Sequence, residues 1–214
     1  MHQIARRKEM TSGERLWAVL NHQEPDRVPI WMLFPRERYE AYVDVHTLPS
    51  YARITPVVWE RTDWFDRRNL PAPRFYTAAT EIDAQVETVG DYTVTRSVLH
   101  TPLGSLTGEH WQDSKNAAGA RVEHYCKDIS DLDKILSIPY EPVQPDLTAF
   151  RQAAGKLGDA GLMMVNIGMP VGAAYGVAHP QDFALWTLTE LDALVHFTRV
   201  MFERQYAFLE KALD

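Results

Sequence analysis

Residues 10–42 read MTSGERLWAVLNHQEPDRVPIWMLFPRERYEAY, and this stretch decides the fold class. Thr11 and Glu14 are spaced so that each side chain can bond a free backbone N–H of the other, which predicts a helix start. Apolar residues recur at helical spacing from Leu16 to Leu20. Pro25 cannot continue a helix. The stretch therefore predicts a short capped helix followed by a turn.

The chain then changes its hydrophobic period. Val28–Phe34, broken by Pro29, is an apolar run without alternation, which is typical of a parallel strand buried on both faces. Arg36 and Arg38 follow directly. Ligands of α/β proteins bind at the carboxyl ends of the strands, and guanidinium groups match carboxylate geometry. These arginines are therefore predicted to bind an anionic substrate, the alternative being ordinary surface charges.

Residues 14–31, ERLWAVLNHQEPDRVPIW, and the strand-to-arginine segment after them resemble the uroporphyrinogen decarboxylase superfamily, which includes corrinoid-linked methyltransferases. The resemblance implies an α/β fold of the TIM-type (β/α) barrel, with its pocket at the carboxyl ends of the strands. It also implies a carboxy-lyase that acts on a tetrapyrrole carboxylate without a metal or another cofactor. A homodimer fits the resembled decarboxylases.

Composition narrows the class of protein. The chain has 214 residues, of which 45% are hydrophobic, so a single domain over residues 1–214 is the simplest expectation. A formal net charge of −7 argues against general nucleic-acid or anionic-membrane binding. The single cysteine, Cys126, suits a reducing cytoplasm. We find neither the apolar core of a signal peptide nor an apolar run long enough to span a bilayer.

The middle of the chain predicts strands of two kinds. Apolar residues around Val57 suggest a third barrel strand. Residues 81–126 alternate with period two on either side of Gly90-Asp91, which predicts two antiparallel hairpins. This β-meander is expected to be an insertion within the barrel.

Strand and helix patterns alternate again beyond Pro145. We predict a helix over residues 147–157, a buried strand over 162–167, and helices over 182–188 and 190–213. A complete barrel typically needs about 250 residues. The barrel is therefore expected to be incomplete in this chain, truncated on its C-terminal side, with an open edge covered by a missing half or a second copy.

The resemblance also suggests where the catalytic residues lie. Asp63 is the best positional match to the family's catalytic aspartate, which stabilises the positive charge on a protonated pyrrole. Asp66 is the second choice, and a helix-capping or loop acid is the ordinary alternative. Tyr175 follows a Gly-Met-Pro-Val-Gly segment like the one preceding the family's active-site tyrosine, although an ordinary buried tyrosine fits as well.

The sequence departs from the decarboxylase pattern at one of the two arginine positions. In true uroporphyrinogen decarboxylases two arginines flank a Gln-Ala-Gly core after the first strand. When the sequences are aligned at Pro29 and Trp31, the second arginine matches Arg38, but Phe34 takes the place of the first. Porphyrinogen decarboxylation therefore requires Arg36 to act as the substitute.

His124 and Cys126 have the spacing of a metal-ligand pair on one face of a strand. A His-x-Cys pair belongs to the zinc site of the corrinoid-linked methyltransferases, but there it lies in the carboxyl half of the barrel. Zinc needs three or four ligands, and the chain has no second cysteine. We therefore predict that no metal binds here.

Three functions remain open. The first is the decarboxylase, acting on a small tetrapyrrole-type substrate through Arg36, Arg38, Asp63 and Tyr175. The second is a methyltransferase-type protein with a corrinoid-linked substrate, lacking the half that carries its zinc ligands. The third is a non-catalytic fragment or partner subunit that binds another chain.

Overall fold

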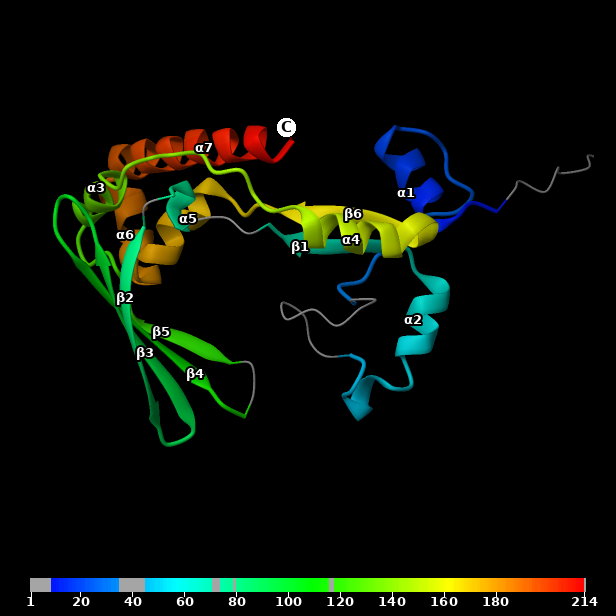
Figure 1. Cartoon of the computed structure of the whole chain (residues 1–214), viewed down its shortest axis with the longest axis horizontal. Coiled ribbons are helices and arrows are strands. Elements are labelled where there is room, and N and C mark those ends of the chain that lie inside the picture. The colour runs from blue at the N-terminus through cyan, green and yellow to red at the C-terminus, as the bar shows by residue number, and fades with distance from the viewer. Residues whose placement is uncertain (1–8, 35–44, 71–73, 79, 116–117, 214) are drawn as a thin grey trace, which may run out of the picture. The chain divides into compact units, whose positions relative to one another are not determined.

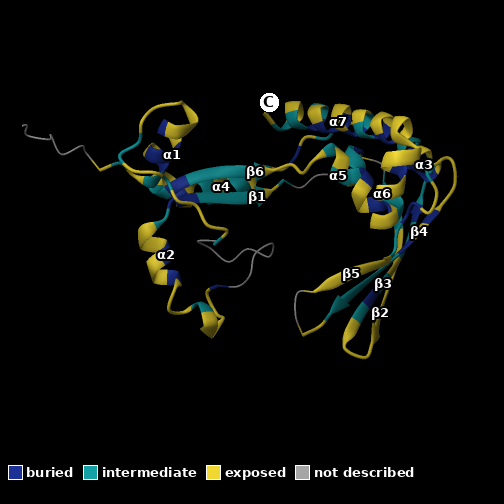
Figure 2. Ribbon diagram, turned by 180° about the vertical axis from the view of Figure 1, so that it is seen from behind, coloured by how far each residue is buried: buried dark blue, intermediate teal, exposed yellow. Residues whose placement is uncertain are grey.

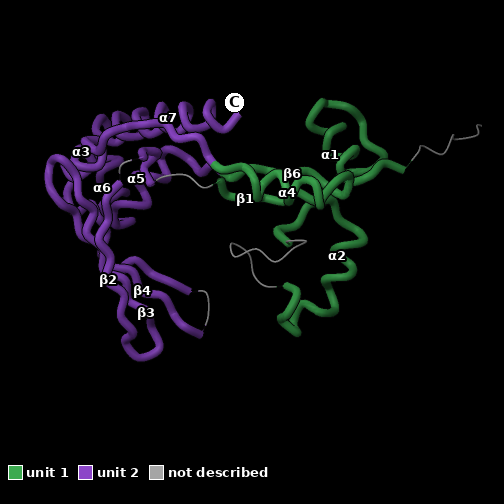
Figure 3. The backbone as a smooth tube through the Cα atoms, viewed as in Figure 1, with its two compact units in different colours: residues 1–70, 146–166 green, residues 71–145, 167–214 purple. Residues whose placement is uncertain are grey.

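The computed structural model describes residues 9–34, 45–70, 74–78, 80–115 and 118–213. Their contacts divide into two compact units (Figure 3). Unit 1 comprises residues 1–70 and 146–166, and unit 2 comprises residues 71–145 and 167–214. The single domain expected over residues 1–214 stays a prediction, because a unit of packing need not be an independently folding domain.

Unit 1 is built on two parallel strands, β1 (Trp64–Asn69) and β6 (Gly161–Asn166) (Figure 1). Trp64 pairs with Gly161 at one end and Asn69 with Asn166 at the other. A Cβ at position 161 would overlap the Trp64 carbonyl, so this register requires glycine. The predicted strand over residues 162–167 is confirmed, displaced by one residue. The helices of this unit are α1 (Ser12–Leu20), α2 (Thr55–Arg61) and α4 (Thr148–Leu157), with short 3-10 turns at Pro49–Tyr51 and Gly158–Ala160.

The capped helix predicted at the start of the chain is confirmed as α1. The Glu14 amide donates to Thr11 Oγ1 at 3.1 Å, and the Thr11 amide donates to Glu14 Oε2 at 2.8 Å. Leu16 is buried, whereas Val19 and Leu20 are exposed. The helix therefore buries a narrower apolar face than its sequence pattern predicts.

The predicted buried strand Val28–Phe34 is wrong. This segment has a single parallel bridge, from Trp31 to Asp63, and Val28 is 78% exposed. Pro29 has no N–H to donate, which interrupts a ladder of hydrogen bonds at that point. The Trp31 ring still packs edge-on against Phe65 with their centroids 5.6 Å apart, so the segment lies beside β1 without pairing along it.

The third strand predicted around Val57 is also wrong, because Val57 lies in helix α2. Pro56 stands in the first turn of that helix, where its fixed φ angle and missing N–H are tolerated. Val58 is buried while Val57 is exposed, as expected for a helix that packs one face. A short apolar run without periodicity fits either structure, and here the proline position decides.

Unit 2 contains a four-stranded antiparallel sheet in the order β2-β3-β4-β5, which confirms the two predicted hairpins. Gly90, at the first turn, has a φ angle of 60°, which favours glycine. The whole chain is thus a mixed α/β protein, and the described residues contain a parallel pair and this antiparallel sheet without a closed barrel. The strands are β2 (Glu81–Val89), β3 (Tyr92–His100), β4 (Leu106–Asp113) and β5 (Gly119–Glu123).

The main core of unit 2 lies between its helices and one end of this sheet (Figure 2). Phe197 and Met201 of α7 are completely buried, as are Ile135 of α3 and Leu99 of β3. The predicted helices over 182–188 and 190–213 are confirmed, and none of the described helices is long and apolar enough to cross a membrane. The helices of this unit are α3 (Asp131–Leu136), α5 (Pro170–Val177), α6 (Pro180–Thr189) and α7 (Leu191–Leu213), with a 3-10 turn at Arg74–Tyr76.

Candidate functional site

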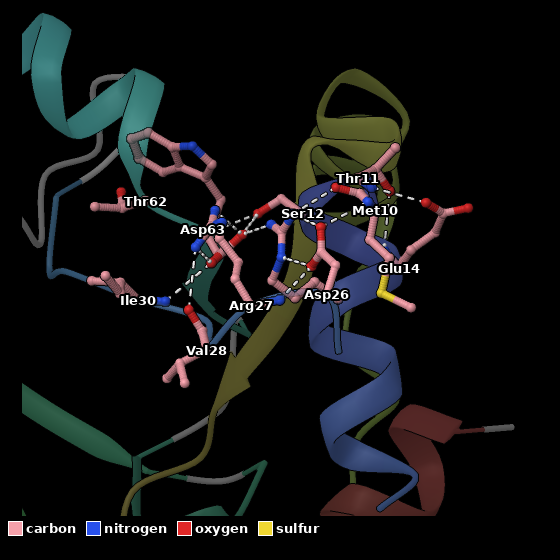
Figure 4. Close-up of polar contacts among 12 residues, drawn as sticks. Met10, Thr11, Ser12, Glu14, Asp26, Arg27, Val28, Ile30, Thr62 and Asp63 are labelled. Atoms are coloured by element: carbon pink, nitrogen blue, oxygen red, sulfur yellow. Dashed lines mark hydrogen bonds and ion pairs between the residues drawn. The ribbon is translucent and has the colours of Figure 1, made fainter. Parts of the chain in front are cut away.

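Asp63 is the centre of a dense polar cluster in unit 1 (Figure 4). Its side chain is 0% exposed. The carboxylate accepts hydrogen bonds from Ser12 Oγ at 2.8 Å, from the Ile30 amide at 3.0 Å and from two nitrogens of Arg27 at 2.9 and 3.1 Å. A guanidinium nitrogen of Arg15 donates the fifth bond. A buried carboxylate is stable only with such compensation.

A second carboxylate completes the cluster. Asp26 accepts hydrogen bonds from Arg15 Nε at 2.6 Å and Arg15 Nη2 at 3.0 Å, and from the amides of Met10 and Arg27 at 2.9 Å. The bonds to Arg15 hold the pKa of Asp26 far below its usual value, and those to Asp26 and Asp63 raise the pKa of Arg15. We name Ser12, Arg15, Asp26, Arg27 and Asp63 the Asp63 cluster.

The Asp63 cluster joins three segments of the sequence. Ser12 and Arg15 come from α1, Asp26 and Arg27 from the turn after it, and Asp63 from the residue before β1. Ser12 Oγ also accepts the Trp64 amide at 3.1 Å. The cluster therefore fixes the start of β1 against the amino-terminal helix. It also explains why the Asn-His-Gln-Glu-Pro-Asp-Arg-Val-Pro link carries adjacent charged residues.

The chemical capacity of Asp63 is limited by these bonds. Five hydrogen bonds occupy its two oxygens, so the carboxylate has no free position from which to hold a substrate N–H or take a proton. Asp63 also precedes β1, at the amino end of the strand. Residues at that end of barrel strands usually serve stability, whereas ligands bind at the carboxyl end. The catalytic role of Asp63 stays a prediction, and its geometry is that of a structural acid.

A polar cavity of about 350 Å³ borders the Asp63 cluster. Its lining includes Arg27, Trp59, Glu60 and Thr62. Arg27 is already bound to Asp63, so its charge is compensated within the protein. This recess is consequently a poor site for a substrate carboxylate.

The carboxyl ends of β1 and β6 carry polar groups that sequence reasoning missed. Asn166 Nδ2 donates to Asn69 Oδ1 at 2.9 Å, which links the last residues of the two strands. Asp66, the second choice for the catalytic acid, accepts a hydrogen bond from Arg68 at 2.7 Å and is largely buried. The signal that could have found Asn166 is a polar residue that ends an apolar run.

The remaining predicted site residues lie elsewhere. Tyr175 is in helix α5 of unit 2, where it is exposed and its ring meets Phe183 edge-on with centroids 5.6 Å apart. Pro170 stands at the start of this helix, where its missing N–H is tolerated. Arg36 and Arg38 lie outside the described residues. Asp63 and Tyr175, the two predicted site residues that the structure describes, therefore belong to different units.

His124 and Cys126 do not form a metal centre with other described side chains. No group of three or more His, Cys, Asp or Glu residues within the described ranges could hold a metal ion. Burial raises the pKa of the Cys126 thiol to about 12, so the metal-binding thiolate is scarce at neutral pH. The His124 ring instead meets His179 edge-on at 5.4 Å, and burial lowers the pKa of His124.

No protein-family model matches this chain, and neither a curated protein nor a solved structure matches it. The likeness to the decarboxylase superfamily therefore rests on the sequence motif of residues 14–31.

The low pKa of Asp26 predicts acid sensitivity. Because the folded-state pKa lies below the unfolded value of about 3.9, the group contributes stability above that value and loses it as the pH falls. Urea unfolding is therefore expected to show a larger difference in stability between wild type and Asp26→Asn at pH 7 than at pH 3. An equal difference at both pH values would contradict this assignment.

Proposed function

We propose that this chain forms part of a metal-free carboxy-lyase of the uroporphyrinogen decarboxylase type, acting on a tetrapyrrole carboxylate. The observation that carries the proposal is the parallel β1–β6 pair, whose carboxyl ends lie in register and present Asn69 and Asn166. The segment after α1 makes a parallel bridge to the start of the same pair. Arg36 and Arg38 follow that segment in the sequence, and α/β proteins bind their ligands beyond the carboxyl ends of parallel strands such as β1 and β6.

In this proposal the polar side chains have different tasks. Arg36 and Arg38 bind substrate carboxylates through paired N–H donors. Asn69 and Asn166 line the edge with amide groups that donate to or accept from the substrate. Asp63 acts as a positioning residue, because its bonds to Arg15 and Arg27 fix the start of β1. Tyr175 remains a candidate for orienting a carboxylate.

The reaction requires a proton donor and an electron sink for the electron pair of the broken carbon–carbon bond. Protonation of a pyrrole ring creates a positive charge that withdraws the electron pair of the breaking carbon–carbon bond. Carbon dioxide leaves, a proton then adds to the remaining methylene carbon to give a methyl group, and the proton first added to the ring is released so that the neutral pyrrole re-forms. The protein must stabilise the transient positive charge. The carboxylate of Asp63 is already bonded to Arg15 and Arg27. We therefore assign the stabilisation of this charge to the polar groups at the carboxyl ends of β1 and β6.

The proposal also includes association with a further chain. The two-stranded sheet leaves β6 with one strand neighbour among the described residues, β1. A strand edge with free backbone groups favours pairing with another strand. A second copy of this chain, or a carboxyl-terminal half, would supply such strands. We further propose a cytoplasmic location, which fits the single buried cysteine.

Substitution of the two arginines tests the substrate contact. Arg36→Gln and Arg38→Gln are each expected to weaken uroporphyrinogen binding about tenfold or more, because each removes a charge-assisted contact with a carboxylate. Arg61→Gln, which alters an arginine on the exposed surface of α2, is the matched control. Equal affinities for all three variants and the wild type would contradict the assignment.

The other two functions predict different outcomes. A methyltransferase-type protein would leave the tetrapyrrole carboxylates intact and would need zinc ligands from another chain. A non-catalytic partner subunit would bind another chain without binding the tetrapyrrole. An apolar groove of about 660 Å³ between α5, α6 and α7 favours the partner-subunit function. Met169, Val195 and Phe202 expose large apolar side chains there, which another chain could cover.

A further inference from the structure

One face of the antiparallel sheet brings polar side chains of different strands into line. In the strand register Thr95 lies opposite His110, and His110 lies opposite Arg121. Two residues further along β3, Ser97 lies opposite Gly108 of β4. Side chains two residues apart on a strand point to the same face. These rows therefore form one continuous surface on the sheet.

A cavity of about 360 Å³ lies on this surface. Ligand pockets in proteins commonly have volumes of about 300–1,000 Å³. Tyr125 covers part of the sheet because Gly108 has no side chain, and a Cβ there would lie 3.2 Å from Tyr125 Cε1. The Tyr125 hydroxyl bonds Ser97 Oγ at 2.8 Å. Ile82 and Ala84 add apolar surface to the lining.

The cavity has an excess of positive charge. Arg74 and Arg121 both line it. The guanidinium group of Arg74 makes no hydrogen bond or ion pair with the described residues. Arg121 donates to the Gly176 carbonyl, and no carboxylate in the described part of the chain forms an ion pair with it. His110, half-buried beside them, adds a ring nitrogen that can donate or accept.

The one carboxylate in the lining does not cancel this charge. Glu109 accepts hydrogen bonds from Arg96 Nε at 2.7 Å and from Trp111 Nε1 at 2.5 Å. Arg96 and Trp111 alternate with the cavity-lining residues of β3 and β4, so they belong to the opposite face of the sheet. The carboxylate of Glu109 is therefore directed to the other face.

We propose that this cavity binds a small organic carboxylate with an apolar body. Arg74 and Arg121 bind the carboxylate, the His110 ring and the Thr95 hydroxyl offer further hydrogen bonds, and Ile82 with Tyr125 contacts the apolar body. This site is separate from the carboxyl ends of β1 and β6, where decarboxylation is proposed. All residues of the cavity belong to unit 2, whereas β1 and β6 belong to unit 1.

Isothermal titration of the full chain with benzoate tests the proposal. Wild-type protein is expected to bind benzoate, and both Arg74→Gln and Arg121→Gln are expected to weaken that binding about tenfold or more. Arg96→Gln removes the same charge from the opposite face and is expected to change the affinity less than about twofold. Arg74→Gln is the safer variant, because it removes no hydrogen bond within the described protein.

Two comparison ligands test the negative charge and the apolar body of the ligand separately. Benzylamine, which has the same ring with a positive charge, is expected not to bind. Inorganic phosphate, which lacks an apolar body, is expected to bind more weakly than benzoate. No benzoate binding, phosphate binding as tight as benzoate binding, or equal losses in Arg74→Gln and Arg96→Gln would each overturn the proposal.

Discussion

Replacing Asp63 with asparagine is expected to lower the free energy of unfolding of unit 1 by about 3–5 kcal/mol. The physical reason is the loss of one charge from a buried pair. The new side chain would present an amide N–H₂ group to Arg15 and Arg27, which are donors themselves, and Arg15 would keep a buried charge with one carboxylate fewer. Urea unfolding at pH 7, followed by circular dichroism and tryptophan fluorescence, measures the change.

The control for this substitution is Asp83→Asn. Asp83 is an exposed carboxylate that contacts His100 across two strands at 2.8 Å. Exposed ion pairs contribute about 0–1 kcal/mol, so the control is expected to change stability little. If Asp63→Asn were as stable as Asp83→Asn, Asp63 would not be the structural acid that its contacts indicate. Its carboxylate would then be free for chemistry, and the predicted catalytic role would gain support.

Replacing Phe197 with alanine is expected to destabilise unit 2 by about 3–5 kcal/mol. Phe197 is 0% exposed and belongs to the core formed by α7, α5, α3 and the end of the sheet. Its removal combines the lost burial of an aromatic ring with the cost of a cavity in a packed interior. Thermal and urea unfolding both measure this loss.

Phe202→Ala on the same helix is the matched control. Phe202 is 56% exposed at the apolar groove, so its truncation is expected to cost much less than that of Phe197. A loss at Phe202 as large as the loss at Phe197 would mean that another chain covers the groove in solution.

Local sequence signals predicted the elements whose stability is local. The reciprocal bonds of Thr11 and Glu14 start α1, and apolar residues at helical spacing indicate α7, whose buried face the structure places at Leu194, Phe197 and Met201. The alternation around Gly90 predicted the hairpin because a tight turn and period two are both local features. Such elements need little information from the rest of the chain.

Predictions failed where distant contacts decide the structure. Val28–Phe34 has the composition of a buried strand, but pairing depends on a neighbour, and this segment makes one bridge to Asp63. Around Val57 the composition fits a strand as well as a helix, and the position of Pro56 favours the helix.

The candidate site shows the same limit. The family resemblance indicates Asp63 by residue type and position, yet the sequence does not reveal that Arg15 and Arg27 enclose it, because both lie more than thirty residues away. Asn69 and Asn166 meet because β1 and β6 pair in register, 97 residues apart in the chain. The two arginines expected to bind substrate, Arg36 and Arg38, lie outside the described residues and stay predictions.

Anaerobic incubation of the purified chain with uroporphyrinogen tests the central claim most directly. The masses of the tetrapyrrole and of the native protein are measured in the same sample. The account predicts that the protein binds the tetrapyrrole and that the substrate loses one or more molecules of carbon dioxide, with the chain associated with a second copy. A monomer that neither binds the tetrapyrrole nor releases carbon dioxide from it would contradict the account.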